Sequence, residues 1–242
     1  MFVAVSPVAA GFSLKSSFPT MLEFTRAHRI IRYMPLFAAP PTIYSLLLKV
    51  LVVGVEAMCR EAGLKVLRYL MHTPDRKLRL GALSNVTCVY ADADFAGEPD
   101  EAKSTGGVLT LLLGSSIDFS SRLQKGTGIS SCESEYMNLT PAVQQGLWLR
   151  KLVANLELEQ QGAIIVQEDN KSAIALANDS GRFRKRTKHI NVKYHFMRQH
   201  IDSGEISLQF CPTKDMLADI YTKPLQGLPF ARLRDAVLQD LI

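Results

Sequence analysis

Apolar and polar residues alternate along most of the chain after residue 85, in the pattern typical of a sheet with interspersed helices. Short runs rich in Val, Leu and Ile, bounded by Gly, Ser or Pro, predict strands. The five predicted strands are Val86–Asp94, Gly107–Gly114, Ile117–Ser121, Ala163–Gln167 and Ile206–Phe210. A short Gly/Ser turn joins the second and third strands, which predicts a hairpin there.

Apolar residues at helical spacing predict helices between and after these strands. Ser130–Glu133, "SSCE", has the S-x-x-E form of a capping box and opens a long helix. Pro141 falls inside that helix, where its ring and missing N–H are expected to kink or restart it. The other predicted helices are Gly63–Met71, a helix after Asn170, Thr187–Ser203 and a short last helix opened by Thr213. This order predicts an α/β fold, a mixed sheet flanked by helices.

The character of the chain changes near residue 85, because the residues before it show no regular alternation. We therefore predict three parts: a poorly defined segment 1–58, a helical segment 59–84 and an α/β domain 85–238. Ile43–Val55 is the most apolar run, but it is short and carries Lys49. A membrane span needs about 20 apolar residues. A buried helix is therefore favoured there, and no membrane crossing is expected.

The chain of 242 residues has a formal charge of +5 and a pI near 9.0. This suits a polyanionic partner, although the charge alone supports one only weakly. Widely spaced cysteines argue against a disulfide framework or a structural zinc site, and favour a reducing compartment. The N-terminus lacks the charged region and apolar core of a signal peptide, although a transit peptide stays an alternative. We expect an intracellular protein that is not secreted.

Four acidic residues stand at strand ends and helix starts, where an α/β sheet exposes its functional edge. Asp92 lies at the end of the first strand, and Asp169 follows the fourth. Glu135 lies in the first turns of the long helix, and Asp219 shares a face of the last helix with Asp215. Gathered carboxylates repel one another unless cations pair with them. Two Mg²⁺ ions about 3.5–4 Å apart play that part in phosphodiester hydrolysis.

Each acid also has a plainer interpretation. Asp92 with Asp94 fits a polar strand end that enters a turn. Asp169 fits a helix N-cap, and Glu135 fits a charge that complements a helix dipole. Asp219 alone fits a solvated helix residue. Taken one at a time, these interpretations stay open.

Five blocks in the same order resemble the ribonuclease H domain of copia-type retrotransposon polyproteins. The blocks are "YADADFAGEPDEAKSTGG", "SSCESEYMNL", "EDNKSAIALA", "RTKHINVKYHFMRQHI" and "LADIYTKPL". The resemblance covers roughly residues 62 to 238, and five ordered blocks are far more specific than one motif. The preceding "GLKVLRYLMHTPD" resembles the segment that joins reverse transcriptase to ribonuclease H, which gives residues 59–84 their interpretation as a connection.

The resemblance implies a ribonuclease H-like fold with a mixed five-stranded sheet, and metal-dependent hydrolysis of RNA in RNA–DNA hybrids. The implied cofactor is Mg²⁺, as two ions, with Mn²⁺ as a substitute. The implied catalytic residues and metal ligands are Asp92, Glu135, Asp169 and Asp219. The implied partners are an RNA–DNA hybrid, reverse transcriptase and other polyprotein products. The implied location is cytoplasmic, in a virus-like particle, or nuclear.

A basic run favours binding to a nucleic-acid backbone. Residues 182–200 contain seven Lys and Arg residues and no acid. Backbone phosphates are the sequence-independent target of such charges. The residues predicted to bind nucleic acid are Arg184, Lys185, Arg186, Lys188, His189 and Lys193. A solvated helix face is the alternative interpretation of the same run.

The alternative to an active nuclease is a catalytically inactive, truncated polyprotein remnant that at most binds nucleic acid. Pro141 favours this alternative, because a kink about two turns after Glu135 is expected to misplace that carboxylate. An integrase-type recombinase is disfavoured, because that class resembles an Asp, Asp, Glu order whereas this chain has Asp, Glu, Asp, Asp. No Tyr-x-Asp-Asp polymerase box occurs, so polymerase activity is not expected.

Overall fold

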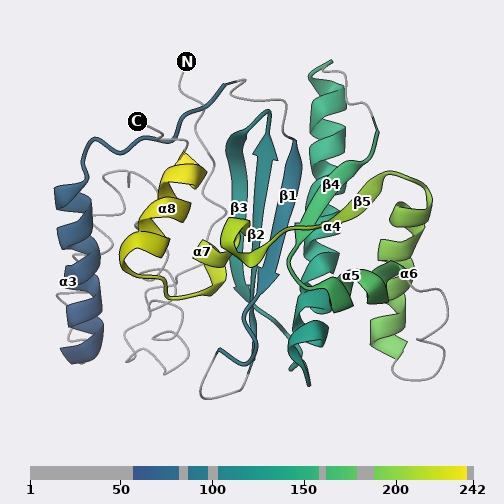
Figure 1. The fold of residues 1–242 in the computed structure, drawn as a ribbon, viewed down its shortest axis with the longest axis horizontal. Coiled ribbons are helices and arrows are strands. Elements are labelled where there is room, and N and C mark those ends of the chain that lie inside the picture. Colours follow the sequence, from purple (N-terminus) through teal and green to yellow (C-terminus); the bar gives the residue numbers. More distant parts are fainter. Residues whose placement is uncertain (1–56, 82–86, 98–102, 158–161, 179–187, 239–242) are drawn as a thin grey trace, which may run out of the picture.

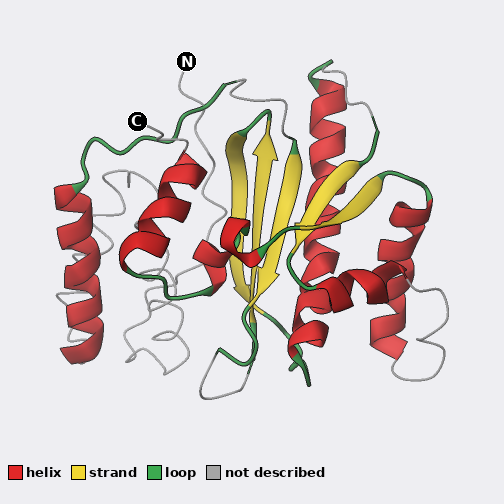
Figure 2. Cartoon of the chain, in the orientation of Figure 1, coloured by secondary structure: helices red, strands yellow, loops and turns green. Residues whose placement is uncertain are grey.

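The computed structural model describes residues 57–81, 87–97, 103–157, 162–178 and 188–238, and for residues 57–63 and 188–194 the backbone alone. One sheet of five strands lies between helices (Figures 1 and 2). The strands are β1 (Cys88–Ala93), β2 (Thr105–Leu112), β3 (Ser115–Leu123), β4 (Ile164–Glu168) and β5 (Ile206–Phe210). The helices are α3 (Ala57–His72), α4 (Ser131–Asn155), α5 (Lys171–Asn178), α6 (Lys188–Asp202), the 3₁₀ turn η2 (Thr213–Asp215), α7 (Asp219–Thr222) and α8 (Gly227–Leu238).

The sheet has the strand order β3-β2-β1-β4-β5. β1 pairs antiparallel with β2, and β2 with β3 through the predicted short turn, whereas β4 pairs parallel with both β1 and β5. The predicted mixed five-stranded sheet flanked by helices is therefore confirmed. The carboxyl ends of the central strands β1 and β4 lie side by side, because Ala91 pairs with Glu168. This edge carries Asp92 and Asp169.

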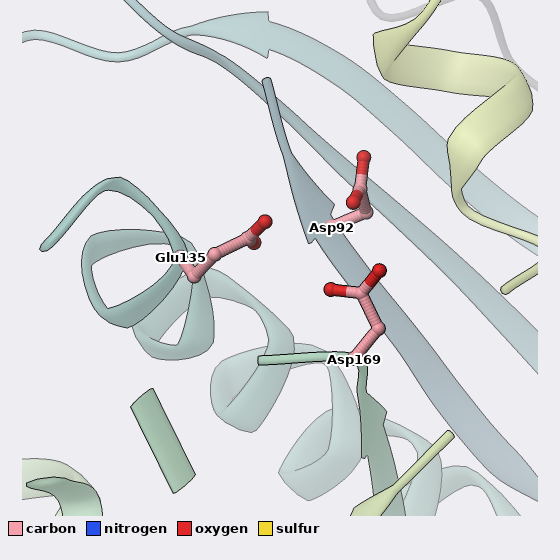
Figure 3. A group of neighbouring side chains, drawn as sticks. All are labelled: Asp92, Glu135 and Asp169. Atoms are coloured by element: carbon pink, nitrogen blue, oxygen red, sulfur yellow. The ribbon is translucent and has the colours of Figure 1, made fainter. Parts of the chain in front are cut away.

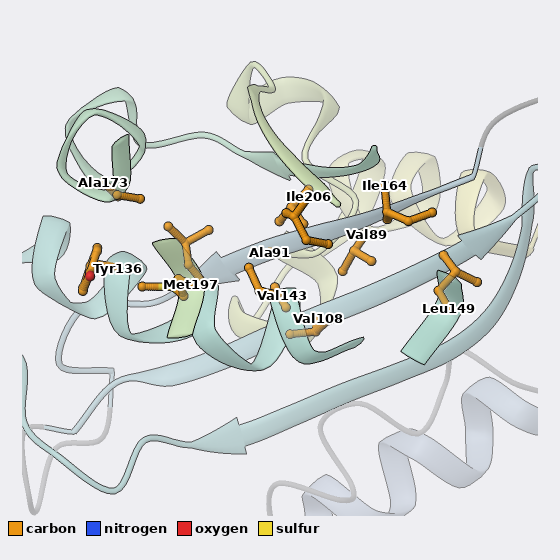
Figure 4. Packing of buried hydrophobic residues seen from close by; sticks show 14 of the residues in the cluster. Val89, Ala91, Val108, Tyr136, Val143, Leu149, Ile164, Ala173, Met197 and Ile206 are labelled. Atoms are coloured by element: carbon orange, nitrogen blue, oxygen red, sulfur yellow. The ribbon is translucent and has the colours of Figure 1, made fainter. Parts of the chain in front are cut away.

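Strand alternation divides the interior into two apolar layers. On one face Val89 and Ala91 pack under α4, α5 and α6, with residues such as Val143 and Met197 (Figure 4). The opposite face packs against α7 and α8. Its buried members are Cys88, Leu109, Leu111, Ile220, Tyr221, Leu233 and Val237. The site at the end of β1 is thus supported from both faces of the sheet.

The long helix α4 passes through Pro141 as one element of 25 residues, so the predicted restart there is wrong. The side chain of Pro141 lies on the exposed face of α4, while Ala142 and Val143 directly after it are buried against the sheet. A proline deprives the helix of one backbone hydrogen bond. The packing of the buried face on both sides of that position keeps the helix together. Ser130 caps its first turn, because the Ser130 hydroxyl accepts the Glu133 N–H at 3.2 Å.

A glycine on β2 allows α7 to approach the sheet closely. A Cβ atom on Gly107 would lie 2.7 Å from Cγ2 of Thr222 and 3.1 Å from the carbonyl oxygen of Ala218. Real Cβ atoms essentially never come closer than 3.0 Å to such neighbours. Gly107 is therefore needed to seat the segment that carries Asp219 and Thr222 against β2.

The end of the chain differs from its prediction. The expected single helix after Thr213 is split, because η2 ends at Asp215 and α7 starts at Asp219. Asp215 is exposed whereas Asp219 is buried, so the two do not share one helical face. The helix α8 was not predicted. Its Leu233 and Val237 cover the second apolar layer.

Helix α3 packs on α8 at the border of the described structure. The rings of Tyr69 and Phe230 lie 5.8 Å apart, and Arg234 donates to the Tyr69 hydroxyl at 3.2 Å. The predicted boundaries at 58 and 84 stay predictions. Most of segment 1–58 lies outside the described residues, and so does the apolar run Ile43–Val55. Within the described part of the chain, no helix combines the length and apolar character of a membrane span.

Candidate active site

Three carboxylates meet at the edge formed by β1 and β4. They are Asp92 near the end of β1, Glu135 in the second turn of α4, and Asp169 directly after β4 (Figure 3). One oxygen of each can be chosen so that all three lie within 4.8 Å of one another. Residues from three elements that are distant in sequence are thus placed together, as the predicted sheet edge requires.

Asp92 is buried, with 1% of its surface exposed. It follows Cys88 and Tyr90 on the strand face that packs against α7, whereas Val89 and Ala91 face α4. The carboxylate of Asp92 accepts hydrogen bonds from the hydroxyl of Thr222 and the ammonium of Lys223. These contacts fix its orientation and compensate its charge.

Glu135 reaches the site from the opposite face of the sheet. Its Oε2 accepts the backbone N–H of Ala93 at 2.6 Å, which ties α4 to the end of β1. Burial, together with the charges of Glu168 and Asp92, raises the pKa of Glu135 to about 10. Burial and the neighbouring carboxylates therefore favour the protonated form of Glu135 when no cation is near.

Asp169 can face the site because the neighbouring residue, Asn170, caps helix α5. Oδ1 of Asn170 accepts the N–H groups of Ser172 and Ala173 at 3.0 and 3.1 Å, so Asn170 is the N-cap of α5. The interpretation of Asp169 as that N-cap is wrong. Its carboxylate instead accepts the hydroxyl of Thr213 at 2.7 Å, which links β4 to the segment after β5.

Asp219 is linked to Asp92 through a lysine, Lys223. It is the first residue of α7, and its Oδ1 accepts the ammonium of Lys223 at 2.6 Å. Burial and the nearby charge of Asp92 raise the pKa of Asp219 to about 6, against the opposing effect of Lys223. Asp219 is buried, so its interpretation as a solvated helix residue is wrong.

Asp94, the second acid of the "YADAD" pair, has a structural contact. Its carboxylate accepts the backbone N–H of Thr105, and its own N–H donates to the Thr105 carbonyl oxygen at 3.1 Å. These two bonds extend the pairing of β1 with β2 beyond the last residue of the strand. Asp92 therefore contributes a carboxylate to the site, whereas Asp94 extends the hydrogen bonding between β1 and β2.

The donor set fits a hard divalent cation. Mg²⁺ and Mn²⁺ prefer oxygen ligands, and Asp92, Glu135 and Asp169 offer carboxylates alone. Burial and the charges of Glu168 and Asp92 raise the pKa of Glu135, so negative charge is in excess around that carboxylate. A cation bound there would relieve that repulsion.

No protein-family model matches the chain. It is 34% identical over 177 residues to the retrovirus-related Pol polyprotein from transposon TNT 1-94 of Nicotiana tabacum. It is 35% identical over 167 residues to the corresponding polyprotein from transposon RE2 of Arabidopsis thaliana. These matches cover 73% and 69% of this chain. Its homologues are Pol polyproteins of plant copia-type transposons.

The chain spans only 13% and 11% of the length of these two Pol polyproteins. Among solved structures, it resembles LC11-RNase H1 in complex with an RNA/DNA hybrid. That likeness has 14% identity and a TM-score of 0.40, and it covers 57% of this chain and 94% of the other. The predicted resemblance to copia-type polyproteins is confirmed by the sequence relatives.

The predicted nucleic-acid contacts of this Pol-related chain are not part of the described site. Arg184, Lys185 and Arg186 lie outside the described residues. Lys188, His189 and Lys193 belong to α6, of which the backbone alone is described at these positions. Their binding role stays a prediction.

Glu168 was missed by the sequence analysis. Its side chain is fully buried, with Oε1 accepting the Asn170 N–H at 3.1 Å. Among the described residues, its Oε2 has no hydrogen-bond partner. Burial and the charges of Asp169 and Asp92, against the effect of the Asn170 bond, raise the pKa of Glu168 to about 8. Strand alternation could have found it, because Glu168 shares a face with the buried Ile164 and Val166.

Asn138 was also missed, although it lies in the "SSCESEYMNL" block. Its side-chain amide donates to the carbonyl oxygens of Asp92 and Gly107, each at 2.9 Å. Asp92 and Gly107 are paired across β1 and β2, so one amide braces both strands beside the site. Its spacing from Glu135 on one helix indicates the same end of α4, but not this contact.

Proposed function

We propose that this chain is a metal-dependent ribonuclease H domain that hydrolyses the RNA strand of RNA–DNA hybrids. The convergence of Asp92, Glu135 and Asp169 within 4.8 Å carries the proposal. Homology to Pol polyproteins supports it, because the order of the acids is the one that the family resemblance implies. Reverse transcriptase and other polyprotein products are the proposed wider partners.

In this proposal, Asp92, Glu135 and Asp169 hold Mg²⁺ or Mn²⁺, and Asp219 completes a second cation site with Asp92. When bound, the cations supply Lewis-acid stabilisation of the charge that develops on the phosphodiester during hydrolysis. Because its pKa is raised, Glu135 would bind a cation more readily as the pH rises.

The chain's own contribution is to place these oxygens before substrate arrives. The Ala93 N–H holds Glu135, the Thr213 hydroxyl holds Asp169, and the Thr222 hydroxyl holds Asp92. Each donor leaves the carboxylate with further lone pairs for a cation. Such outer contacts orient metal ligands and tune their affinity.

The basic run at 182–200 is proposed to bind the phosphate backbone of the hybrid. Its contacts would be sensitive to salt and insensitive to base sequence. The geometry and 2′-hydroxyls of the RNA strand would then determine which strand is cut. In this proposal the basic run binds the hybrid, and the carboxylates carry out the hydrolysis.

The test is cleavage of a labelled hybrid by the full chain, beside Asp92→Asn, Asp169→Asn and the control Asp75→Asn. Asp75 is exposed and lies outside the site. Loss of an outer-shell partner of a metal ligand alone costs about 10–100-fold, so loss of a ligand should cost at least about 100-fold. Hybrid binding should persist in both site variants, and Asp75→Asn should cut normally.

Undiminished cleavage by Asp92→Asn or Asp169→Asn would refute the assignment of these residues. Hybrid binding by the unchanged chain without any cutting would establish the inactive remnant instead. Pro141 lies within a continuous α4 that keeps Glu135 among the three carboxylates, which supports the active alternative over that remnant.

A further inference from the structure

Lys223 lies between two carboxylates that the proposed function assigns to a cation. Its ammonium is 2.6 Å from Oδ1 of Asp219 and 3.2 Å from Oδ1 of Asp92. Both carboxylates are nearly buried, whereas the lysine side chain is 34% exposed. The ammonium of Lys223 therefore contacts two nearly buried carboxylates from the solvent side.

The contacts of Lys223 meet the electrostatic demand that a cation would meet. Two carboxylates at close range cannot both stay charged without a compensating positive charge. The ammonium of Lys223 lies within hydrogen-bond distance of both carboxylates and supplies that positive charge. Because the oxygens of Asp92 and Asp219 already bind this ammonium, a metal ion bridging the same two groups would compete with it.

We propose that Lys223 is a positioning residue that holds Asp92 and Asp219 together in the cation-free protein and leaves them when a divalent cation binds between them. This inference rests on the proposed function, because it takes Asp92 and Asp219 as a shared cation site. It adds that the ammonium of Lys223 competes with the cation and so weakens the cation affinity of the second site.

The backbone around Lys223 allows this exchange. Its N–H donates to the Asp219 carbonyl oxygen at 2.9 Å and ends α7 there, so the main chain stays fixed when the side chain moves. The Thr222 hydroxyl keeps its hold on Oδ2 of Asp92. Lys223 itself is partly exposed, so its long side chain can turn toward water without crossing the core.

The experiment compares thermal unfolding of the full chain, Lys223→Met and the control Lys214→Met, each in chelator and in excess Mg²⁺. Lys214 is an exposed lysine nine residues earlier in the chain. In chelator, Lys223→Met should melt well below the unchanged chain, because two buried carboxylates lose their counter-charge. In Mg²⁺ the gap should close, because the cation takes the place of the ammonium. Lys214→Met should behave like the unchanged chain in both.

Calorimetric titration with Mn²⁺ supplies a second readout. Removing a competitor should tighten the weaker of the two cation sites by at least about fivefold in Lys223→Met, the low end of typical coupling between sites. Lys223→Arg keeps the charge and should restore cation-free stability and the weaker affinity. If Lys223→Met does not fold in chelator, Lys223→Gln, which keeps part of the hydrogen bonding, carries the same comparison.

An equal loss of melting temperature in chelator and in Mg²⁺ would overturn the proposal, because it would make Lys223 a purely structural contact. Weaker Mn²⁺ binding in Lys223→Met would overturn it as well. Thermal unfolding and Mn²⁺ titration do not depend on hydrolysis, so the Lys223 proposal can be refuted independently of the proposed ribonuclease function. A chain that never cuts a hybrid but shows the metal-dependent reversal would retain the Lys223 proposal and lose the proposed function.

Discussion

Replacing Asn138 with alanine should destabilise the protein at the point where the fold supports the site. Asn138 is buried, and its amide donates to the carbonyl oxygens of Asp92 and Gly107 at 2.9 Å each. Alanine would leave both carbonyls without this donor in a place that water does not reach. Each unsatisfied buried group costs about 1–3 kcal/mol. Because a carbonyl oxygen has two lone pairs, we expect the lower part of the range, a total of about 2–4 kcal/mol.

Urea denaturation followed by circular dichroism measures this loss directly. In a thermal scan followed by the same signal, the melting temperature should fall by roughly 5–15 °C, at about 2–4 °C per kcal/mol for a chain of this size. The matched control is Gln144→Ala on the exposed face of the same helix, which should change stability by less than about 0.5 kcal/mol. An Asn138→Ala chain as stable as the control would refute the argument that this amide braces β1 and β2.

Two further predictions concern packing and charge around the same edge. Gly107→Ala should lower the free energy of unfolding by about 1–3 kcal/mol in thermal unfolding, because its Cβ would collide with the α7 segment. An unchanged stability would contradict the close approach of α7 to β2. In chelator, the free energy of unfolding should fall as the pH rises from about 5 to about 8, because the raised pKa values of Asp219 and Glu168 favour their protonated forms in the folded state. Glu168→Gln should flatten this dependence in pH-dependent urea titrations, and an unchanged slope would show that Glu168 does not titrate as its burial predicts.

The sheet and most helices could be predicted from the sequence because they rest on local patterns. Alternation marks both faces of β1 and β4, and the capping box at Ser130 marks the start of α4. Pro141 misled the prediction because tertiary packing decided the outcome. Its ring lies on the exposed face of α4, and the buried residues around it hold the helix against the sheet. The break between η2 and α7 was missed because both fall within one helix-compatible run.

The site could be predicted only as a set of acids at one edge. Strand and helix ends place Asp92, Glu135 and Asp169 near one another, and the ordered blocks gave their proposed roles. The contacts that hold them were not predictable, because they depend on side-chain geometry between distant segments. Lys223 shows this limit. Its spacing from Asp219 indicates one helical face, but its second contact with Asp92 comes from the seating of α7 on β2.

The central claim is most directly tested by strand-specific cleavage with the full chain. Three duplexes are compared, an RNA–DNA hybrid with either strand labelled, a DNA duplex and an RNA duplex, each in Mg²⁺ and in excess chelator. We predict that the RNA strand of the hybrid is cut in Mg²⁺ and left intact in chelator, while the other strands stay intact in both. Cutting that persists in chelator, or a folded chain that leaves the hybrid intact in Mg²⁺, would contradict the proposed function.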